Sequence, residues 1–415
     1  MKDYPRITTP PPGPKARALI DRDRAWASPS YIKEYPLVVA RASGVVVEDV
    51  DDNRYLDFMA GIAVASTGHA HPKVVAAITE TASRFLHICA TDFYYEEMTA
   101  LCERLALLAP GPSKKRVFVT NSGAEAVEGA MKLARHATRR PAFIAFDGAF
   151  HGRTYGAMSL TSSKAVQRFG FGPFLPDVHH VKYPEVRAID ELFYRRLDPR
   201  DVAAIFVEPV QGEGGYIVPP RGFLTSLREL CDRHGILLVC DEVQSGIGRT
   251  GRMFACEYDG IEPDILLTAK GLGSGMPIGA IIAREAVMTW PAGAHGSTFG
   301  GNPVCCAAAL ATLDLVEGGL TSNACTRGAE LLTGLQRIAD GRKPITQVRG
   351  LGLMLGIEFA EATMSRELVQ RAFRKGLLLL GAGKSTVRLA PPLIVDEYDV
   401  ETALGIIEEI VAELG

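Results

Sequence analysis

The middle of the chain alternates short apolar runs with segments whose apolar residues recur at helical spacing. Each run is apolar at consecutive positions, which indicates strands buried on both faces, as in a parallel sheet covered by helices. Between the runs, Val127, Ala130, Met131 and Ala134 mark one apolar helix face, and 223–233 has the pattern of a crossover helix. This alternation predicts an α/β domain with a mostly parallel central sheet. The expected strands are 116–120, 142–146, 202–207, 236–240, 264–268 and 280–283.

The two ends of the chain carry a different pattern. Prolines at positions 5, 10, 11, 12 and 14 predict an extended arm at the N-terminus, and a hairpin is expected over 44–58 with turn residues at 51–53. Near the C-terminus, strands are expected at 352–358 and 387–390, and helices near 366–375 and 400–414. The predicted organisation is an arm and part of a small α+β domain at 1–70, a large domain at 71–320 and the rest of the small domain at 321–415.

Composition narrows the class of protein. Of 415 residues, 47% are hydrophobic and 22% are charged, which is enough apolar material for a sizeable core. With 45 basic and 48 acidic residues the formal charge is −3, and no basic stripe suggests a nucleic-acid surface. No apolar run approaches the roughly 18 residues of a membrane helix, and the first residues lack a signal core, so a cytoplasmic protein is expected. The eight cysteines form no CxxC pair, and no metal site is assigned.

Two glycine motifs look like nucleotide-binding signatures. Residues 246–251 read GIGRTG, a literal GxGxxG, but no helix start follows, which argues against a dinucleotide site. Residues 381–386 read GAGKST and resemble the end of a P-loop, yet the first glycine of that motif is replaced by Leu378 and no helix follows Ser385. We expect a plain turn there.

Polar side chains at the ends of two predicted strands suggest covalent chemistry. Lys270 follows a buried strand, where its amine could form a Schiff base, although such lysines more often extend their amine to solvent. Asp241 and Val243 lie two apart after another strand, so that both side chains point the same way if extended backbone persists. A carboxylate at the end of an apolar strand is costly unless a cation or donor meets it.

Two further segments follow strands of the same sheet. Ser122, Gly123 and Ala124 join a strand to the apolar-faced helix, and their backbone could bind a phosphate at the helix N-terminus, although a simple helix cap is equally compatible. Phe150 and Arg153 offer an aromatic ring and a cation after the 142–146 strand. Because parallel strands end at one edge of a sheet, all four segments are expected to converge there.

Taken in order, these motifs resemble the class III (omega) aminotransferases, which are fold type I enzymes that depend on pyridoxal 5′-phosphate (PLP). The resemblance runs from about 55–58 to 387–392 and covers most of the chain. It implies an α/β fold with a large PLP-binding domain and a smaller domain from both termini. The motifs that carry it are SGAEA at 122–126, FHGRT at 150–154, EPVQGEGG at 208–215, DEVQSG at 241–246, GRTG at 248–251, TAK at 268–270 and GSTFGGNP at 296–303.

The resemblance implies a role for each cofactor residue. Lys270 would bind PLP covalently and shuttle the substrate proton, while Asp241 would keep the pyridine nitrogen protonated. Val243 and Phe150 would sandwich the ring, and Gln244 would bind its phenolic oxygen. The remaining contacts, to the phosphate, would come from Ser122, Gly123 and Ala124 and from Thr298 of a neighbouring subunit. The active unit would then be a homodimer, or a higher even oligomer, with shared active sites.

The resemblance also implies substrate contacts. Arg153 resembles the arginine for a distal carboxylate, and Arg388 the arginine for the α-carboxylate of glutamate and 2-oxoglutarate. Glu208 resembles a switch that pairs with Arg388 when an ω-amine donor enters. Ile62 stands where ornithine enzymes resemble one another in having a tyrosine, which favours 4-aminobutyrate or N-acetylornithine as the donor and 2-oxoglutarate as the acceptor.

Two other functions stay open from the sequence alone. The proline-rich arm (10–15) resembles a subgroup that also contains PLP-dependent amino-acid racemases, which use the same lysine and cofactor. The retained Arg153, Glu208 and Arg388 favour transamination, because a racemase has no need of a second carboxylate site. A nicotinamide-dependent oxidoreductase, suggested by the GxGxxG motif, is the remote alternative.

Overall fold

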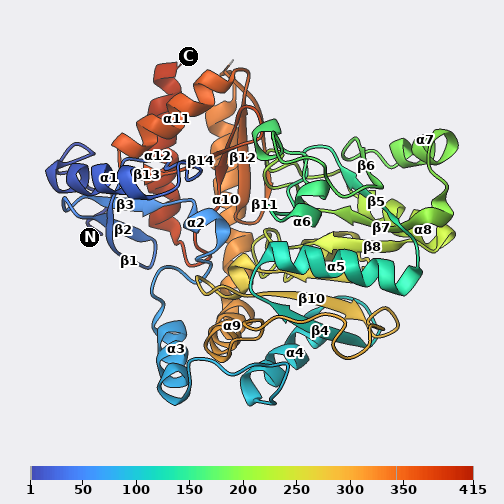
Figure 1. Cartoon of the computed structure of the whole chain (residues 1–415). Coiled ribbons are helices and arrows are strands. Elements are labelled where there is room, and N and C mark those ends of the chain that lie inside the picture. The colour runs from blue at the N-terminus through green and yellow to red at the C-terminus, as the bar shows by residue number, and fades with distance from the viewer. Residues whose placement is uncertain (1, 343, 415) are drawn as a thin grey trace.

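A computed structural model describes residues 2–342 and 344–414 of the chain. Its largest sheet has seven strands in the order β4-β10-β9-β8-β7-β5-β6 (Figure 1). Neighbours from β9 to β6 pair in parallel, whereas β10 runs antiparallel to both β4 and β9. The strands are β4 (Lys115–Thr120), β5 (Ala142–Phe146), β6 (Val178–Val181), β7 (Val202–Val207), β8 (Leu237–Asp241), β9 (Ile265–Thr268) and β10 (Gly279–Arg284).

Alternate side chains along these strands enter two separate hydrophobic layers. Phe143 and Ala145 of β5 pack in the layer under α5 (Gly123–Thr138), which crosses in front of the sheet in Figure 1. Ile144 and Phe146 point the other way, into the layer that also holds the apolar residues of α4 (Glu96–Leu108) and α8 (Phe223–His234). Both faces of the sheet are therefore covered, as the continuous apolar runs predicted.

The two ends of the chain share one neighbouring unit. The antiparallel strands β1, β2 and β3 are extended by β13 from the C-terminal region, with Leu377 opposite Leu56. A second sheet, in the order β11-β12-β15-β14, is antiparallel throughout and packs against α10 and α11, and α12 packs on both of these helices. The elements are β1 (Val39–Ser43), β2 (Val46–Asp49), β3 (Arg54–Asp57), β11 (Ile345–Leu351), β12 (Met354–Phe359), β13 (Leu377–Leu378), β14 (Leu380–Ala382), β15 (Thr386–Leu389), α10 (Thr321–Ala339), α11 (Ala362–Arg374) and α12 (Glu397–Leu414).

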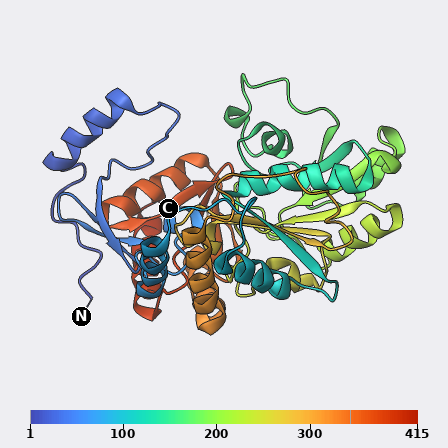
Figure 2. The same ribbon diagram turned by 60° about the horizontal axis from the view of Figure 1, so that its bottom comes forward.

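Short helices fill the connections. In Figure 2, α1 projects from the edge of the smaller unit, and Ala16 is its buried residue. The helical turn α2 contains Gly61 and Ile62 in the left-handed region. Their bounds are α1 (Pro14–Trp26), α2 (Ala60–Ala63), α3 (Pro72–Arg84), α6 (Tyr155–Leu160) and α7 (Arg187–Arg195).

A long helical stretch departs from the sequence-based expectation about membranes. Pro303–Ala339 consists of α9 (Pro303–Leu315), the π-helical turn η5 (Val316–Leu320) and α10, and its length and composition alone would let it cross a membrane. However, half of its most apolar window is buried inside the protein, and α9 packs on α3 and α4. Packing therefore accounts for its apolar character.

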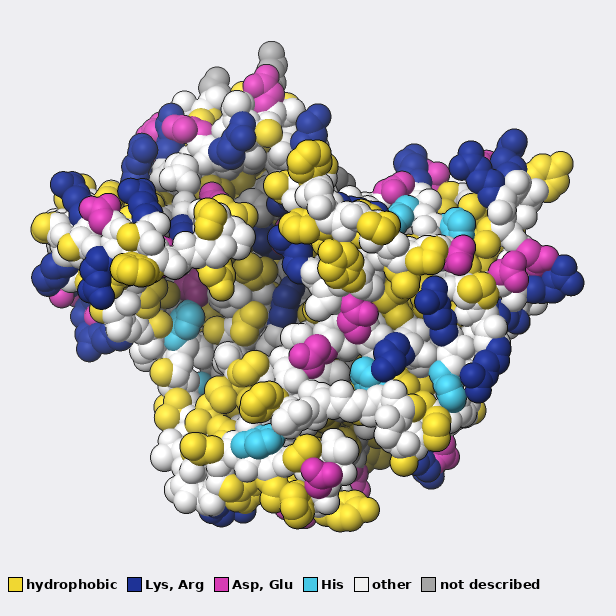
Figure 3. All heavy atoms as spheres, viewed as in Figure 1, with side chains coloured by type: hydrophobic (Ala, Val, Ile, Leu, Met, Phe, Trp, Pro, Cys, Tyr) yellow, Lys and Arg dark blue, Asp and Glu magenta, His cyan; other side chains and the backbone are white. Residues whose placement is uncertain are grey.

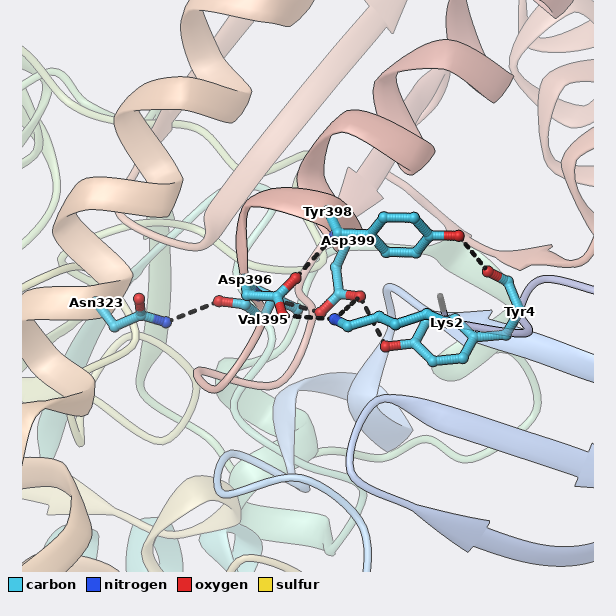
Figure 4. A network of polar contacts seen from close by, with 7 residues as sticks. All are labelled: Lys2, Tyr4, Asn323, Val395, Asp396, Tyr398 and Asp399. Carbon is cyan, nitrogen blue, oxygen red and sulfur yellow. Dashed lines mark hydrogen bonds and ion pairs between the residues drawn. The ribbon is translucent and has the colours of Figure 1, made fainter.

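The N-terminal arm is fixed to the C-terminal region by a polar network (Figure 4). The Lys2 ammonium contacts Asp396 at 2.5 Å and Asp399 at 3.0 Å, and the Tyr4 hydroxyl donates to Asp399 at 2.9 Å. The Tyr398 hydroxyl donates to the carbonyl of Tyr4 at 3.1 Å. The arm is thus held at the start of α12. Its extended backbone agrees with the proline pattern.

The expected strands of the large sheet agree with the structure to within about a residue at each end. Five strands were not predicted: β1, β6, β11, β13 and β14. Helix α1 was also missed, because the arm was expected to stay extended and only its N-terminal part does so. The exact domain boundaries at residues 70 and 320 stay predictions.

Candidate active site

A cavity of about 420 Å³ opens where five strands of the large sheet end. Its lining comes from the segments that follow β4, β5, β7, β8 and β9, together with Gly275–Ile278. This is the edge at which parallel α/β sheets bind ligands. Figure 3 shows a hollow between the two lobes of the molecule, with Lys and Arg side chains on its wall. Ten predicted site residues line this cavity: Ser122, Gly123, Ala124, Phe150, Arg153, Glu208, Asp241, Val243, Gln244 and Lys270.

Lys270 stands just beyond β9 with an unusual backbone. Its backbone φ is +41°, a left-handed value that residues other than glycine rarely adopt. Burial, reinforced by the positive charge of Arg388, lowers the pKa of its amine to about 8. Among the described residues it forms no ion pair. A much larger fraction of the amine is therefore neutral at physiological pH than for an ordinary lysine, and this fraction can act as a nucleophile.

Asp241 ends β8 with both carboxylate oxygens engaged. One accepts from the backbone N–H of Val243 at 3.0 Å, and the other lies 2.7 Å from Nδ1 of His151. Burial opposes a charge on His151, but the hydrogen bond and negative charge of Asp241 outweigh it and raise the histidine's pKa. His151 was not among the predicted residues, although it lies inside the FHGRT motif between Phe150 and Arg153.

The first turn of α5 provides a seat for an anion. Ser122 caps the helix by accepting from Glu125 N at 3.2 Å. Gly123 and Ala124 lie in the first turn, where backbone N–H groups have no carbonyl partner within the helix. A Cβ on Gly123 would lie 2.8 Å from a methyl of Val243, so glycine lets the two segments approach each other. The helix dipole favours negative charge at this point.

Apolar and polar side chains line the cavity between Lys270 and the start of α5. Phe150 and Val243 line the cavity. Gln244 accepts a hydrogen bond from the Tyr216 hydroxyl at 2.7 Å, which leaves its amide nitrogen as the available donor. The arrangement therefore places an apolar contact and a hydrogen-bond donor in one site, beside Asp241.

The expected pair of Glu208 with Arg388 is absent from the structure. Arg388 instead donates to Glu213 at 2.5 Å, and the two side chains are 5% and 14% exposed. Both oxygens of Glu208 are occupied by backbone donors, Phe150 N and Gly212 N, each at 2.9 Å. Glu208 therefore ties two active-site loops together. Burial raises its pKa to about 7.

Glu213 belongs to the same EPVQGEGG motif, five residues after Glu208, and was overlooked. A carboxylate flanked by glycines is a signal that sequence reasoning could have used. Burial opposes its ionisation, but the charges of Arg388 and Lys164 outweigh that effect and hold its pKa below the ordinary value. Arg388 and Glu213 therefore form a charged pair.

Three predicted residues are exposed, one of them at the cavity wall and two outside the lining. The Arg153 guanidinium lies at the cavity wall, 5.7 Å from the ring centroid of Phe150, and is exposed. Ile62 is 39% exposed in a strained left-handed turn with φ of +68° and does not line the cavity. Thr298 is also exposed and outside the lining, so a role at a cofactor needs a second subunit.

The residues around the cavity fit PLP. A lysine amine of lowered pKa, a buried carboxylate, apolar walls and an open helix N-terminus supply a covalent anchor, a pyridinium partner, ring contacts and a phosphate seat. The two glycine motifs have other uses. Residues 246–251 form turns without a following α-helix, and residues 383–385 form the turn between β14 and β15.

Comparisons with known proteins agree with this chemistry. Residues 28–411 match the family model Aminotransferase class-III. The chain is 38% identical to the 4-aminobutyrate aminotransferase of Mycobacterium leprae, over 98% of both chains. It is 42% identical to the acetylornithine aminotransferase of Methanopyrus kandleri, over 94% of this chain and 97% of that one. It is also 38% identical to the alanine/serine racemase of Pyrococcus horikoshii, over all of this chain and 94% of that one.

A solved structure extends the likeness to the fold. The ornithine aminotransferase of Toxoplasma gondii, described with partial occupancy of PLP at its active site, superposes with a TM-score of 0.89 at 34% identity. The match covers 96% of this chain and 94% of that one. The chain therefore belongs to the class-III aminotransferases, PLP-dependent transaminases of fold type I.

Proposed function

We propose that this transaminase moves an amino group from an ω-amino donor, of the 4-aminobutyrate or N-acetylornithine kind, to 2-oxoglutarate, and so forms a semialdehyde and glutamate. The observation that carries the proposal is the buried pair of Arg388 with Glu213 beside Lys270. A paired guanidinium leaves room for a donor without an α-carboxylate. Once Glu213 withdraws, the same guanidinium can bind the α-carboxylate of 2-oxoglutarate in bidentate fashion.

Each cofactor-binding residue has a task in this proposal. Lys270 anchors PLP, Asp241 holds a proton on the pyridine nitrogen, and Phe150 and Val243 contact the two ring faces. The backbone of Ser122, Gly123 and Ala124 would hold the phosphate. When bound, PLP supplies an electron sink that stabilises negative charge at the substrate carbon bearing the amine.

The protein's own groups then move the proton and orient the substrate. Lys270 would take the proton from that substrate carbon. Gln244 donates to the cofactor's phenolic oxygen through its amide nitrogen. At the mouth of the cavity, Arg153 binds the distal carboxylate of 4-aminobutyrate.

A racemase acting on a small amino acid is the second candidate, favoured by the likeness to the alanine/serine racemase. It would use the same lysine but would transfer no amino group. A panel of amino donors with 2-oxoglutarate, read as glutamate formed, supports the transaminase if an ω-amine is active. Chiral analysis of single amino acids with no keto acid present supports the racemase if one enantiomer is converted into the other.

The anchoring role of Lys270 has a direct test. Borohydride reduction of the purified enzyme should fix PLP on the peptide that contains Lys270, and Lys270→Ala should lose turnover while it stays folded. Label on another lysine would overturn the assignment.

Asp241→Ala should be almost as inactive as Lys270→Ala, because the pyridine nitrogen would lose the carboxylate that keeps it protonated. Wild-type rates in that variant would mean a structural role.

The proposed assembly is a homodimer, or a higher even oligomer, in the cytoplasm, with no membrane or nucleic-acid partner. Thr298 of one subunit would reach the PLP phosphate of the other. Its exposure, and that of the neighbouring Phe299, support this arrangement, as does the exposed segment that carries Leu86, Phe93 and Tyr94. Such an apolar group of side chains is typical of an interface between subunits.

A further inference from the structure

Glu213 contacts a second cation besides Arg388. One carboxylate oxygen accepts from Arg388, and the other lies 3.4 Å from the ammonium of Lys164. The Lys164 side chain is 39% exposed, against 5% for Arg388. The carboxylate therefore bridges a buried cation on one side and a partly solvated cation on the other.

The backbone that carries Lys164 is fixed beside the cavity. The N–H groups of Ser162 and Ser163 both donate to the carbonyl of Ala149, at 2.8 and 3.1 Å. Ala149 directly precedes Phe150, which lines the cavity. Lys164 is therefore held next to Glu213 by the same turn that positions an active-site ring.

The backbone of Glu213 is fixed as well. Its carbonyl accepts from Gly383 N at 2.8 Å, and Arg349 donates to the carbonyl of Gly215 through Nη2 at 2.6 Å. A change of partner at Glu213 is thus a rotation of its side chain, not a movement of the loop. Gly212 and Gly214 on either side carry no side chain that would obstruct such a rotation.

We propose that Lys164 is the residue that receives Glu213 when a substrate α-carboxylate takes its place on Arg388, and so sets the ease of that exchange. The inference rests on the proposed function of Arg388. Two carboxylates cannot share one guanidinium without repulsion, and a buried carboxylate left without a cation is costly. Lys164 is already in contact with Glu213, so the displaced carboxylate keeps a partner at the solvated edge of the site.

The test compares two half-reactions in Lys164→Met, which keeps the length of the side chain and removes the charge. Stopped-flow absorbance of the holoenzyme follows each half separately. Reaction of the amine-loaded enzyme with 2-oxoglutarate should show apparent affinity weakened about three- to fivefold, the upper range for a partly exposed ion pair. The half-reaction with the ω-amine donor should stay within about twofold, because Arg388 and Glu213 remain paired. Lys164→Arg should restore the wild-type balance.

Two controls separate this role from a structural one. In a Glu213→Gln background Lys164→Met should add no further effect, because the charge that it serves is gone. Lys182→Met, which removes an exposed ion pair with Glu185 outside the cavity lining, should change neither half-reaction. Equal slowing of both halves, no change in either, or full additivity with Glu213→Gln would each overturn the inference while the proposed function stands.

Failure of the proposed function gives a different pattern. The wild type would then transfer no amino group from any ω-amine to 2-oxoglutarate. In that case the inference is tested by the binding of α-amino acids, which also carry an α-carboxylate. Lys164→Met must weaken the spectroscopic binding of L-alanine and L-glutamate by a similar factor, and unchanged binding of both would overturn it.

Discussion

His151 shows how a single buried side chain can adjust the cofactor site without touching substrate. Its Nδ1 lies 2.7 Å from Asp241, and its Nε2 has no partner among the described residues. Replacing it with phenylalanine would leave that carboxylate oxygen buried without a donor, and so would weaken the proposed hold of Asp241 on the pyridinium proton. We expect His151→Phe to lower kcat by about 10- to 100-fold, the usual scale for a residue that orients a reactive group.

His151→Asn is the matched variant, because its amide can place a donor near the position of Nδ1. It should recover part of the lost rate, and the visible spectrum of the bound cofactor should follow the same order across the three proteins. If phenylalanine and asparagine are equally harmful, or equally harmless, the histidine serves packing and not the carboxylate.

Lys270 predicts the pH dependence of cofactor capture. A protonated amine cannot attack the PLP aldehyde, and the pKa of Lys270 is lowered from 10.5 to about 8. The rate at which the cofactor-free protein binds PLP covalently should therefore rise with pH, with a midpoint near 8, and level off above it. Burial is the main cause and the charge of Arg388 the next, so Arg388→Met should move the midpoint to higher pH.

The direction in Arg388→Met follows from the sign of the charge. A nearby cation disfavours the protonated amine, so its removal makes protonation easier and the pKa rises toward 10.5 from about 8. The midpoint of PLP capture must accordingly move to higher pH. It should still lie below 10.5, because burial continues to lower the pKa of Lys270. Stopped-flow absorbance across a pH series measures both midpoints, and coincident curves would contradict the assigned cause.

At the scale of elements, the turn between β14 and β15 supports the loop that carries Glu213. Gly383 has φ of +57°, and a Cβ there would lie 2.7 Å from the carbonyl oxygen of Gly214. Gly383→Ala should therefore destabilise the protein by about 1 kcal/mol or more and raise the KM for 2-oxoglutarate. Gly381→Ala in the same motif is the control, because its nearest neighbour would be 4.0 Å away. Thermal unfolding and steady-state kinetics should separate the two variants, and equal behaviour would contradict this role.

How far the sequence predicted these elements depends on what each residue contacts. Buried strands such as β7 are apolar at every position and were readily predicted. The edge strand β6 reads Val-His-His-Val, and β13 has two residues, so neither carries a pattern strong enough to recognise. The lining residues that follow strands were predicted for the same reason, because their position along the chain implies their position in space.

Contacts between segments that lie far apart in the chain could not be predicted from the sequence. The choice between Glu208 and Glu213 as the partner of Arg388 depends on which carboxylate the backbone N–H groups of Phe150 and Gly212 occupy. That is decided by the packing of three loops and not by any local pattern. The resemblance to the family located the motif but not the correct glutamate within it.

At the scale of the molecule, Arg249 connects the large sheet to the smaller unit. Its side chain is fully buried and donates to the carbonyls of Leu353 and Pro391, at 3.1 and 2.5 Å. Those two carbonyls flank β12 and β15, and Arg388 lies on β15. The position of Arg388 near Lys270 therefore depends on this contact between the units. The glycines around Arg249, first considered as a nucleotide motif, give its loop the left-handed turns that it needs at Gly248 and Gly251.

The proposed sharing of active sites between subunits makes the last prediction. Thr298→Glu places a negative charge where the partner's PLP phosphate would sit, and Lys270→Ala removes the anchor in the same chain's own site, so each homodimer should be nearly inactive. In a hybrid of the two, one site carries both changes and the other carries neither. After random exchange about a quarter of all sites should be intact, so mixing two inactive proteins should restore activity.

A mixture of Lys270→Ala with Asp241→Ala is the control. If both residues act only within their own subunit's site, each site of that hybrid keeps one defect, and the activity should not exceed that of the parents. Recovery in the first mixture and not in the second places Thr298 across the interface, and no recovery in either removes it from the partner's site.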